Sequence, residues 1–124
     1  MAARAWQSLN FIQVFDVLRE QTVCRMAVTE ADGQPWCVPM EYQMEVAGRE
    51  VIFHVGSRGE GRLAEAVETN DAVCLEVERP GCGWLDTVII TGRVAAIISV
   101  ESGGAVLLIH AEEISGRRYF TPDG

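Results

Sequence analysis

The chain has 124 residues, of which 48% are hydrophobic and 23% are charged, and its net charge is −8. A chain of this length and composition is expected to fold as one globular domain over residues 1–124. The acidic balance argues against nucleic-acid and anionic-membrane partners, because both attract clustered lysine and arginine. No apolar run is long enough to span a bilayer, and no apolar segment follows Arg4 as it would in a secretory signal. We therefore expect a cytoplasmic location.

The first predicted element is an amphipathic helix over about residues 9–20, which Ser8 or Asn10 can cap. Apolar residues recur there at helical spacing and form one face: Phe11, Val14, Phe15 and Leu18.

Strands are expected next. Alternating apolar residues predict a strand over 22–29, and the Asp32-Gly33 pair favours a hairpin turn. The following strand, 34–45, contains Pro35 and Pro39, which cannot donate to a ladder, so it should lie at an edge or carry bulges. An edge of this kind could offer its polar groups to a ligand. A third strand is expected over 51–55.

The second half of the chain predicts a helix over 62–69, with Leu63, Ala66 and Val67 inward, and a strand over 72–77. Residues 87–100 follow as one long strand or as a strand with a bulge near Gly92. Residues 106–114 fit both helix and strand in part, and we favour a strand. Six short strands separated by turns indicate a mainly-β protein, a small closed or split barrel.

The cysteines form no CxxC pair and have no histidine at metal-ligand spacing. We interpret Cys24, Cys37, Cys74 and Cys82 as small buried hydrophobic residues, without a metal or a disulfide. Trp6 and Trp36 are interpreted as packing residues, and His110 as structural.

The segment from His54 to Arg62 is the most informative for function. A strand ends there, three glycines follow, and a helix begins near Arg62. Backbone N–H groups at a helix start bind anions, and Ser57, Arg58 and Arg62 add donors suited to phosphate. A surface turn with solvated arginines is the competing interpretation. His54 alone is more often a packed residue than a catalyst.

Several segments taken in order resemble a known family. They are Pro35-Trp36-Cys37-Val38-Pro39-Met40-Glu41-Tyr42, His54 to Arg62 with its glycines, and Trp84 followed by Thr87-Val88-Ile89-Ile90-Thr91-Gly92. Over about residues 9–97 the chain is similar to the pyridoxamine 5′-phosphate oxidase-like FMN-binding split barrels, specifically their nitroimidazole-resistance branch.

The resemblance implies a six-stranded antiparallel barrel of Greek-key type. It also implies a homodimer with FMN in a groove between the subunits, and a small organic substrate, such as a nitroaromatic compound, reduced by the flavin. His54 is the candidate catalytic residue. By position, the residues implied at the cofactor are Val38, Pro39 and Met40, through their backbone groups, with His54, Ser57, Arg58, Arg62, Trp84 and Thr87, of which the last two can come from the partner chain.

Two alternatives stay open. The barrel could be a flavin or haem carrier or sensor without turnover, in which His54 or His110 would be the iron ligand. It could also be a dimeric interaction domain without a cofactor.

Overall fold

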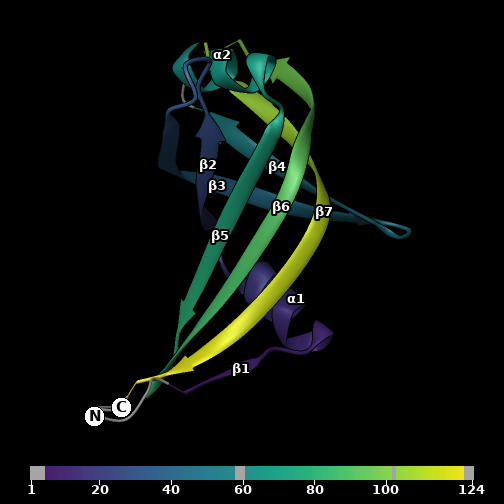
Figure 1. The fold of residues 1–124 in the computed structure, drawn as a ribbon. Coiled ribbons are helices and arrows are strands. Elements are labelled where there is room, and N and C mark those ends of the chain that lie inside the picture. The colour runs from purple at the N-terminus through teal and green to yellow at the C-terminus, as the bar shows by residue number, and fades with distance from the viewer. Residues whose placement is uncertain (1–4, 58–60, 102, 122–124) are drawn as a thin grey trace.

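A computed structural model describes residues 5–57, 61–101 and 103–121 (Figure 1). Two helices and seven strands form over these residues. In chain order they are β1 (Trp6–Ser8), α1 (Phe11–Glu20), β2 (Val23–Thr29), β3 (Pro35–Ala47), β4 (Glu50–Ser57), α2 (Gly61–Thr69), β5 (Ala72–Pro80), β6 (Trp84–Ser99) and β7 (Ala105–Phe120).

Six of the strands close into an antiparallel barrel. β2, β3 and β4 follow one another as neighbours, and after α2 the chain returns so that β5 lies beside β2. β6 and β7 continue from β5, and β7 pairs with both β6 and β4, which closes the barrel. A fourth strand that returns beside the first is a Greek key. The predicted mainly-β, six-stranded antiparallel barrel is therefore confirmed. The short β1, which was not predicted, pairs with the end of β7.

The barrel interior is filled by side chains that alternate along each strand, as a half-buried strand requires. The largest side chains with almost no exposure include Met26, Phe53, Val55, Leu75, Val77, Val88, Ile90, Leu107 and Ile109. α2 adds Leu63, Ala66 and Val67 to this core, as predicted.

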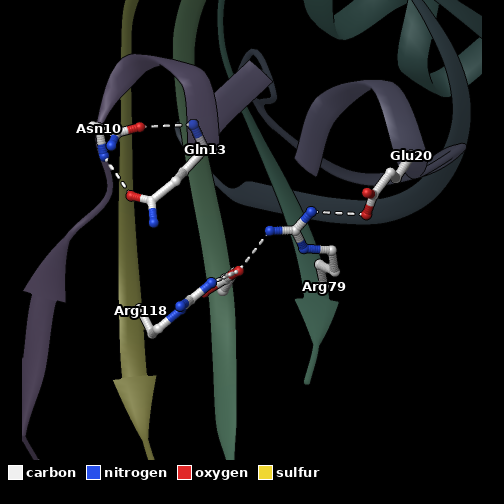
Figure 2. A network of polar contacts seen from close by, with 6 residues as sticks. Asn10, Gln13, Glu20, Arg79 and Arg118 are labelled. Carbon is white, nitrogen blue, oxygen red and sulfur yellow. Dashed lines mark hydrogen bonds and ion pairs between the residues drawn. The ribbon is translucent and has the colours of Figure 1, made fainter. Parts of the chain in front are cut away.

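The first helix begins at the predicted cap. The Asn10 side chain accepts a hydrogen bond from the Gln13 N–H at 2.8 Å, and Gln13 Oε1 accepts one from the Asn10 N–H at 2.9 Å (Figure 2). This reciprocal pair is a capping box. The buried face was predicted wrongly at one position: Phe11 is 75% exposed, because the first turn lies beside a cavity, and Val17 is buried instead. No helix in the described part of the chain is long and apolar enough to cross a membrane.

A bulge interrupts β6 where it was predicted. The register with β7 shifts between Thr91 and Gly92, and again between Val94 and Ala96. A side chain at Gly92 would collide with the backbone carbonyl oxygen of His110 on β7. Glycine is required there because the two strands approach closely.

The last three strands run further than their apolar patterns predict. β5 continues to Pro80, β6 starts at Trp84 and β7 reaches Phe120. The charged residues of this extension pair with one another: fully buried Asp86 accepts hydrogen bonds from Arg118 at 2.7 and 3.0 Å and from Arg79 at 2.9 Å. Arg79 also bonds Glu20 at 2.7 Å, which ties α1 to the barrel (Figure 2).

The predicted burial was also wrong for two of the cysteines. Cys37 and Cys82 are exposed, since Cys37 occupies an outward position of β3 and Cys82 lies in the turn between β5 and β6. Cys24 is buried as expected, and burial raises its thiol pKa to about 12. Trp6 is 49% exposed and lies under the Arg117 guanidinium, 4.1 Å from the ring centre.

Candidate functional site

The first half of β3 has a strand neighbour on one side only. β2 pairs with β3 from Pro35 to Glu41, whereas β4 pairs with it only from Glu41 onward. Residues 35–40 therefore have an open edge, toward β4, in the part of the chain that the structure describes. β3 lies between β2 and β4 in the sheet order, so the predicted edge covers only the first half of the strand. The predicted bulges are absent from the pairing of β3 with β2 and with β4 over the described residues.

The backbone groups at this open edge follow from the hydrogen-bond alternation. The Tyr42 N–H donates to the Thr22 carbonyl at 3.0 Å, so even-numbered β3 residues turn their polar groups toward β2. Odd-numbered residues turn theirs toward the open edge. Proline has no N–H, so Cys37 supplies the donor between Pro35 and Pro39.

This alternation divides the three residues that were predicted to line a cofactor through their backbones, according to the side toward which their backbone groups point. Val38 and Met40 pair with Met26 and Cys24 of β2, and their side chains are half-buried. Pro39 instead turns its carbonyl toward the open edge. Backbone contacts with a ligand at this edge are therefore available from Cys37 and Pro39.

Arg62 stands in the first turn of α2 and reaches the start of β3. Its Nε and Nη2 donate to the two Glu30 carboxylate oxygens at 2.9 and 2.7 Å. Its guanidinium also lies over the Trp36 ring, 4.5 Å from the ring centre. The hydrogen bonds from Arg62 lower the pKa of Glu30 below its ordinary value. Arg62, a predicted phosphate ligand, thus lies at the start of the open edge of β3, where its guanidinium is paired with the Glu30 carboxylate.

The two other predicted phosphate ligands lie between β4 and α2. Ser57 ends β4 opposite Ala105 of β7, and its side chain is outside the described residues. Arg58 lies entirely outside them. The chain connection alone places both positions within a few residues of Arg62.

The histidines lie on the outer face of the barrel. His54 Nε2 is 2.8 Å from Glu45 Oε1, and in the sheet His54 lies between Gln43 and Leu108. His110 Nε2 is 3.3 Å from Glu50 Oε2. Each ring nitrogen that faces a carboxylate must carry a proton to make that contact. Among the described residues, no cluster of three or more metal-ligating side chains occurs.

Trp84 and Thr87 lie far from Arg62 within one chain. α2 leads directly into Ala72 of β5, whereas Trp84 follows the other end of that strand. Nine strand residues span roughly 30 Å, and Figure 1 shows α2 and the distal end of β5 at opposite ends of the barrel. Trp84 packs under Arg118, 4.8 Å from the ring centre. Thr87 is half-buried between Glu78 and Arg117. The structure therefore brings Arg62 to the start of β3 and leaves Trp84 and Thr87 apart, while among the described residues His54 contacts Glu45 rather than Arg62.

Reasoning from the sequence missed Glu30 and Cys37. Glu30 lies 32 positions before Arg62, and only the β2–β3 turn, closed by the hydrogen bond from the Gly33 N–H to the Glu30 carbonyl, presents it to α2. Cys37 is distinguished by its position midway between two prolines, two residues after Pro35 and two before Pro39. That spacing is visible in the sequence and could have identified it.

Residues 13–102 match the family model described as pyridoxamine 5′-phosphate oxidase. The chain belongs to this family. The resemblance found in the ordered motifs of β3, β4 and β6 is thereby confirmed. No curated protein sequence matches this member of the pyridoxamine 5′-phosphate oxidase family.

Solved structures share the fold of this pyridoxamine 5′-phosphate oxidase family member. An FAD-binding protein from Mesorhizobium loti is 21% identical, with a TM-score of 0.76 over 91% of this chain and 97% of its own. A candidate 5-nitroimidazole antibiotic resistance protein from Bacteroides thetaiotaomicron is 14% identical, with a TM-score of 0.81 over 95% of this chain and 90% of its own. An FAD-binding protein from Mycobacterium smegmatis is 23% identical, with a TM-score of 0.66 over 92% and 98%.

Proposed function

We propose that this protein binds FMN and acts as a flavin-dependent reductase of a small organic substrate. The open edge of β3 beside Arg62 is the observation that carries this proposal. There the Cys37 N–H and the Pro39 carbonyl can pair with the acceptors and donors along the edge of a flat heterocycle. Membership of the family and the similarity to two FAD-binding proteins support a flavin.

The phosphate end of the flavin is assigned to the start of α2. A helix start favours an anion, and a guanidinium binds phosphate through paired N–H donors. Arg62 is held at this place by Trp36 and Glu30. In our proposal, Ser57 and Arg58 complete the phosphate site. The phosphate either binds Arg62 together with Glu30 or replaces Glu30 as its partner.

A second copy of the chain completes the site in this proposal. Trp84 and Thr87 are too far from Arg62 to reach the same flavin within one chain, so the partner subunit supplies them. Apolar side chains on the outer face of β4, β6 and β7 favour such a homodimer. Ile98 is 49% exposed opposite half-buried Val106, and outward-facing Leu108 and Ile52 are half-buried further along the same face. Apolar groups gathered on an outer face indicate an interface.

When bound, FMN supplies the electron-transfer chemistry, and the protein orients it and tunes its surroundings. The backbone of β3 would fix the ring plane, and Arg62 the phosphate. In this proposal the 2.8 Å contact between Glu45 Oε1 and His54 Nε2 orients the imidazole ring. We propose His54 as the residue that holds a proton for the substrate.

Spectroscopy of the purified protein tests the proposal. A flavin absorption spectrum, or saturable quenching of FMN fluorescence by the colourless protein, supports it. Arg62→Ala should weaken FMN binding at least tenfold, because hydrogen bonds to charged groups contribute about 1.5–3 kcal/mol. Arg93→Ala is the matched control, since Arg93 pairs with Asp71 away from the site.

Other outcomes would overturn the proposal. A Soret band on addition of haem, with no uptake of FMN, would favour the haem-binding alternative. FMN binding that Arg62→Ala leaves unchanged would remove the phosphate assignment. If FMN binds but NADH or NADPH with a nitroaromatic acceptor gives no turnover, the protein is a carrier or sensor rather than a reductase.

A further inference from the structure

A cavity of about 650 Å³ lies between α1, the β3–β4 hairpin turn and β7. Its apolar lining comes mainly from Leu9, Phe11, Val14, Phe15, Val46 and Val51. Phe11 and Phe15 face each other with ring centres 4.5 Å apart. Cavities of this size and apolar character are typical of small-molecule sites.

The close approach of α1 to β7 shapes this cavity. The Leu9 N–H donates to the Gly116 carbonyl at 2.9 Å. A side chain at Gly116 would lie 2.8 Å from a Val14 methyl group and 3.0 Å from Leu9. The glycine thus lets the start of α1 pack on the strand, while the hairpin turn at Gly48 and Arg49 forms the opposite wall.

Two arginines line the cavity without a carboxylate partner among the described residues. Arg19 is exposed and lies over the Phe15 ring, 5.6 Å from its centre, and exposed Arg49 has no ion pair there. The other described arginines, except Arg117, are paired with acidic side chains. In a chain with a net charge of −8, such a concentration of unneutralised positive charge beside apolar side chains favours an anion that has an apolar body.

Within one chain, the cavity is separate from the part of the proposed flavin site that Arg62 and the open edge of β3 form. Val46 is seven residues from Pro39 along β3, which corresponds to roughly 23 Å of strand. None of the residues predicted to hold the cofactor lines the cavity. A ligand bound here therefore does not depend on FMN.

We propose that this cavity binds an amphipathic monocarboxylate. The apolar chain or ring would lie against Phe11, Phe15 and Val46, and the carboxylate would accept hydrogen bonds from Arg19 and Arg49. Guanidinium groups suit this role because their planar donors match a carboxylate.

Isothermal titration calorimetry of the full chain with decanoate, below its micelle concentration, tests the proposal. Arg19→Gln and Arg49→Gln should each weaken decanoate binding about tenfold or more, because each removes charged hydrogen bonds. Decanol, which has the same chain without the charge, should also bind at least tenfold more weakly. Val46→Trp should abolish binding by filling the cavity, and at 52% exposure this position tolerates a large side chain.

Arg117→Gln is the matched control, since Arg117 also lacks an acidic partner among the described residues but does not line the cavity. It should leave decanoate binding unchanged, as should Arg62→Ala. The proposal is overturned if wild-type protein takes up no decanoate, if decanol binds equally well, or if Arg117→Gln weakens binding as much as Arg49→Gln. A loss of binding in Arg62→Ala would move the ligand to the flavin site and would also overturn it.

Discussion

The Arg62 guanidinium donates two hydrogen bonds to the Glu30 carboxylate, and these bonds join the start of α2 to the turn between β2 and β3. Both elements border the open edge of β3. The pair therefore controls how much positive charge this edge presents to an anion.

We expect Glu30→Gln to strengthen FMN binding by no more than about fivefold, since solvent screens an exposed ion pair of this kind and leaves it weak. The amide no longer competes with phosphate for Arg62. Fluorescence titration measures the affinity, and Glu112→Gln, which removes a distant carboxylate near Arg93, is the control. Weaker binding in a folded Glu30→Gln protein would mean that the pair serves the site by positioning Arg62.

Asp86→Asn should lower the free energy of unfolding by about 3 kcal/mol, because it leaves Arg79 and Arg118 without their shared buried counter-charge. Urea unfolding measures the change. Asp71→Asn removes an exposed pair with Arg93 and should cost less than about 1 kcal/mol. Equal losses in the two variants would contradict a special role for the buried carboxylate.

The same carboxylate predicts a pH dependence. Burial alone would raise the pKa of Asp86, but the hydrogen bonds from Arg118 and Arg79 outweigh it and hold the pKa below its ordinary value. Its stabilising contribution is complete above the unfolded-state pKa of about 3.9 and is lost as the pH falls through the lower, folded-state pKa. Unfolding free energies measured from pH 7 to pH 3 should fall less steeply below pH 4 in Asp86→Asn than in wild type. Parallel curves would show that another group is responsible.

Ile98→Lys should convert the proposed dimer into a monomer and weaken FMN binding at least tenfold, since the partner's Trp84 and Thr87 are then lost from the site. Sedimentation velocity and fluorescence titration measure the two effects. Val23→Lys places the same charge at an equally exposed valine of β2 and should change neither. A monomeric wild-type protein with full FMN affinity would rule out the shared site.

Gly92→Ala should destabilise the barrel by about 2 kcal/mol, because the new methyl group would push β6 away from the His110 carbonyl. Gly56→Ala is a suitable comparison, as no atom lies within 4 Å of its added methyl group. Thermal unfolding should separate the two variants clearly, and similar melting temperatures would show that the bulge adapts.

The sequence predicts well wherever a local pattern determines the structure. The helix cap at Asn10, one of the two predicted positions, and the inward face of α2 both follow from neighbours in the chain. The bulge near Gly92 was one of two alternatives for β6. Two prolines four residues apart, Pro35 and Pro39, likewise identified β3 as a strand with unpaired positions.

Contacts that depend on topology were not predictable from the sequence. Glu30 meets Arg62 only because α2 folds over the β2–β3 turn. Asp86 interrupts an apolar pattern in the sequence, and its burial is explained only by the hydrogen bonds that it accepts from Arg79 and Arg118. The cavity near Phe11 arises from packing between α1 and a hairpin turn that lies distant in the chain.

The prolines of β3 have a consequence for solubility. A strand edge that is open to a ligand is equally open to a strand of another molecule, which is a route to aggregation. Pro35 and Pro39 turn their nitrogens toward this edge and present no N–H, so an incoming strand finds a single donor, at Cys37, where a complete ladder would need one at every second residue. Replacing both prolines would restore that ladder, and the open edge of β3 would then recruit strands of other chains.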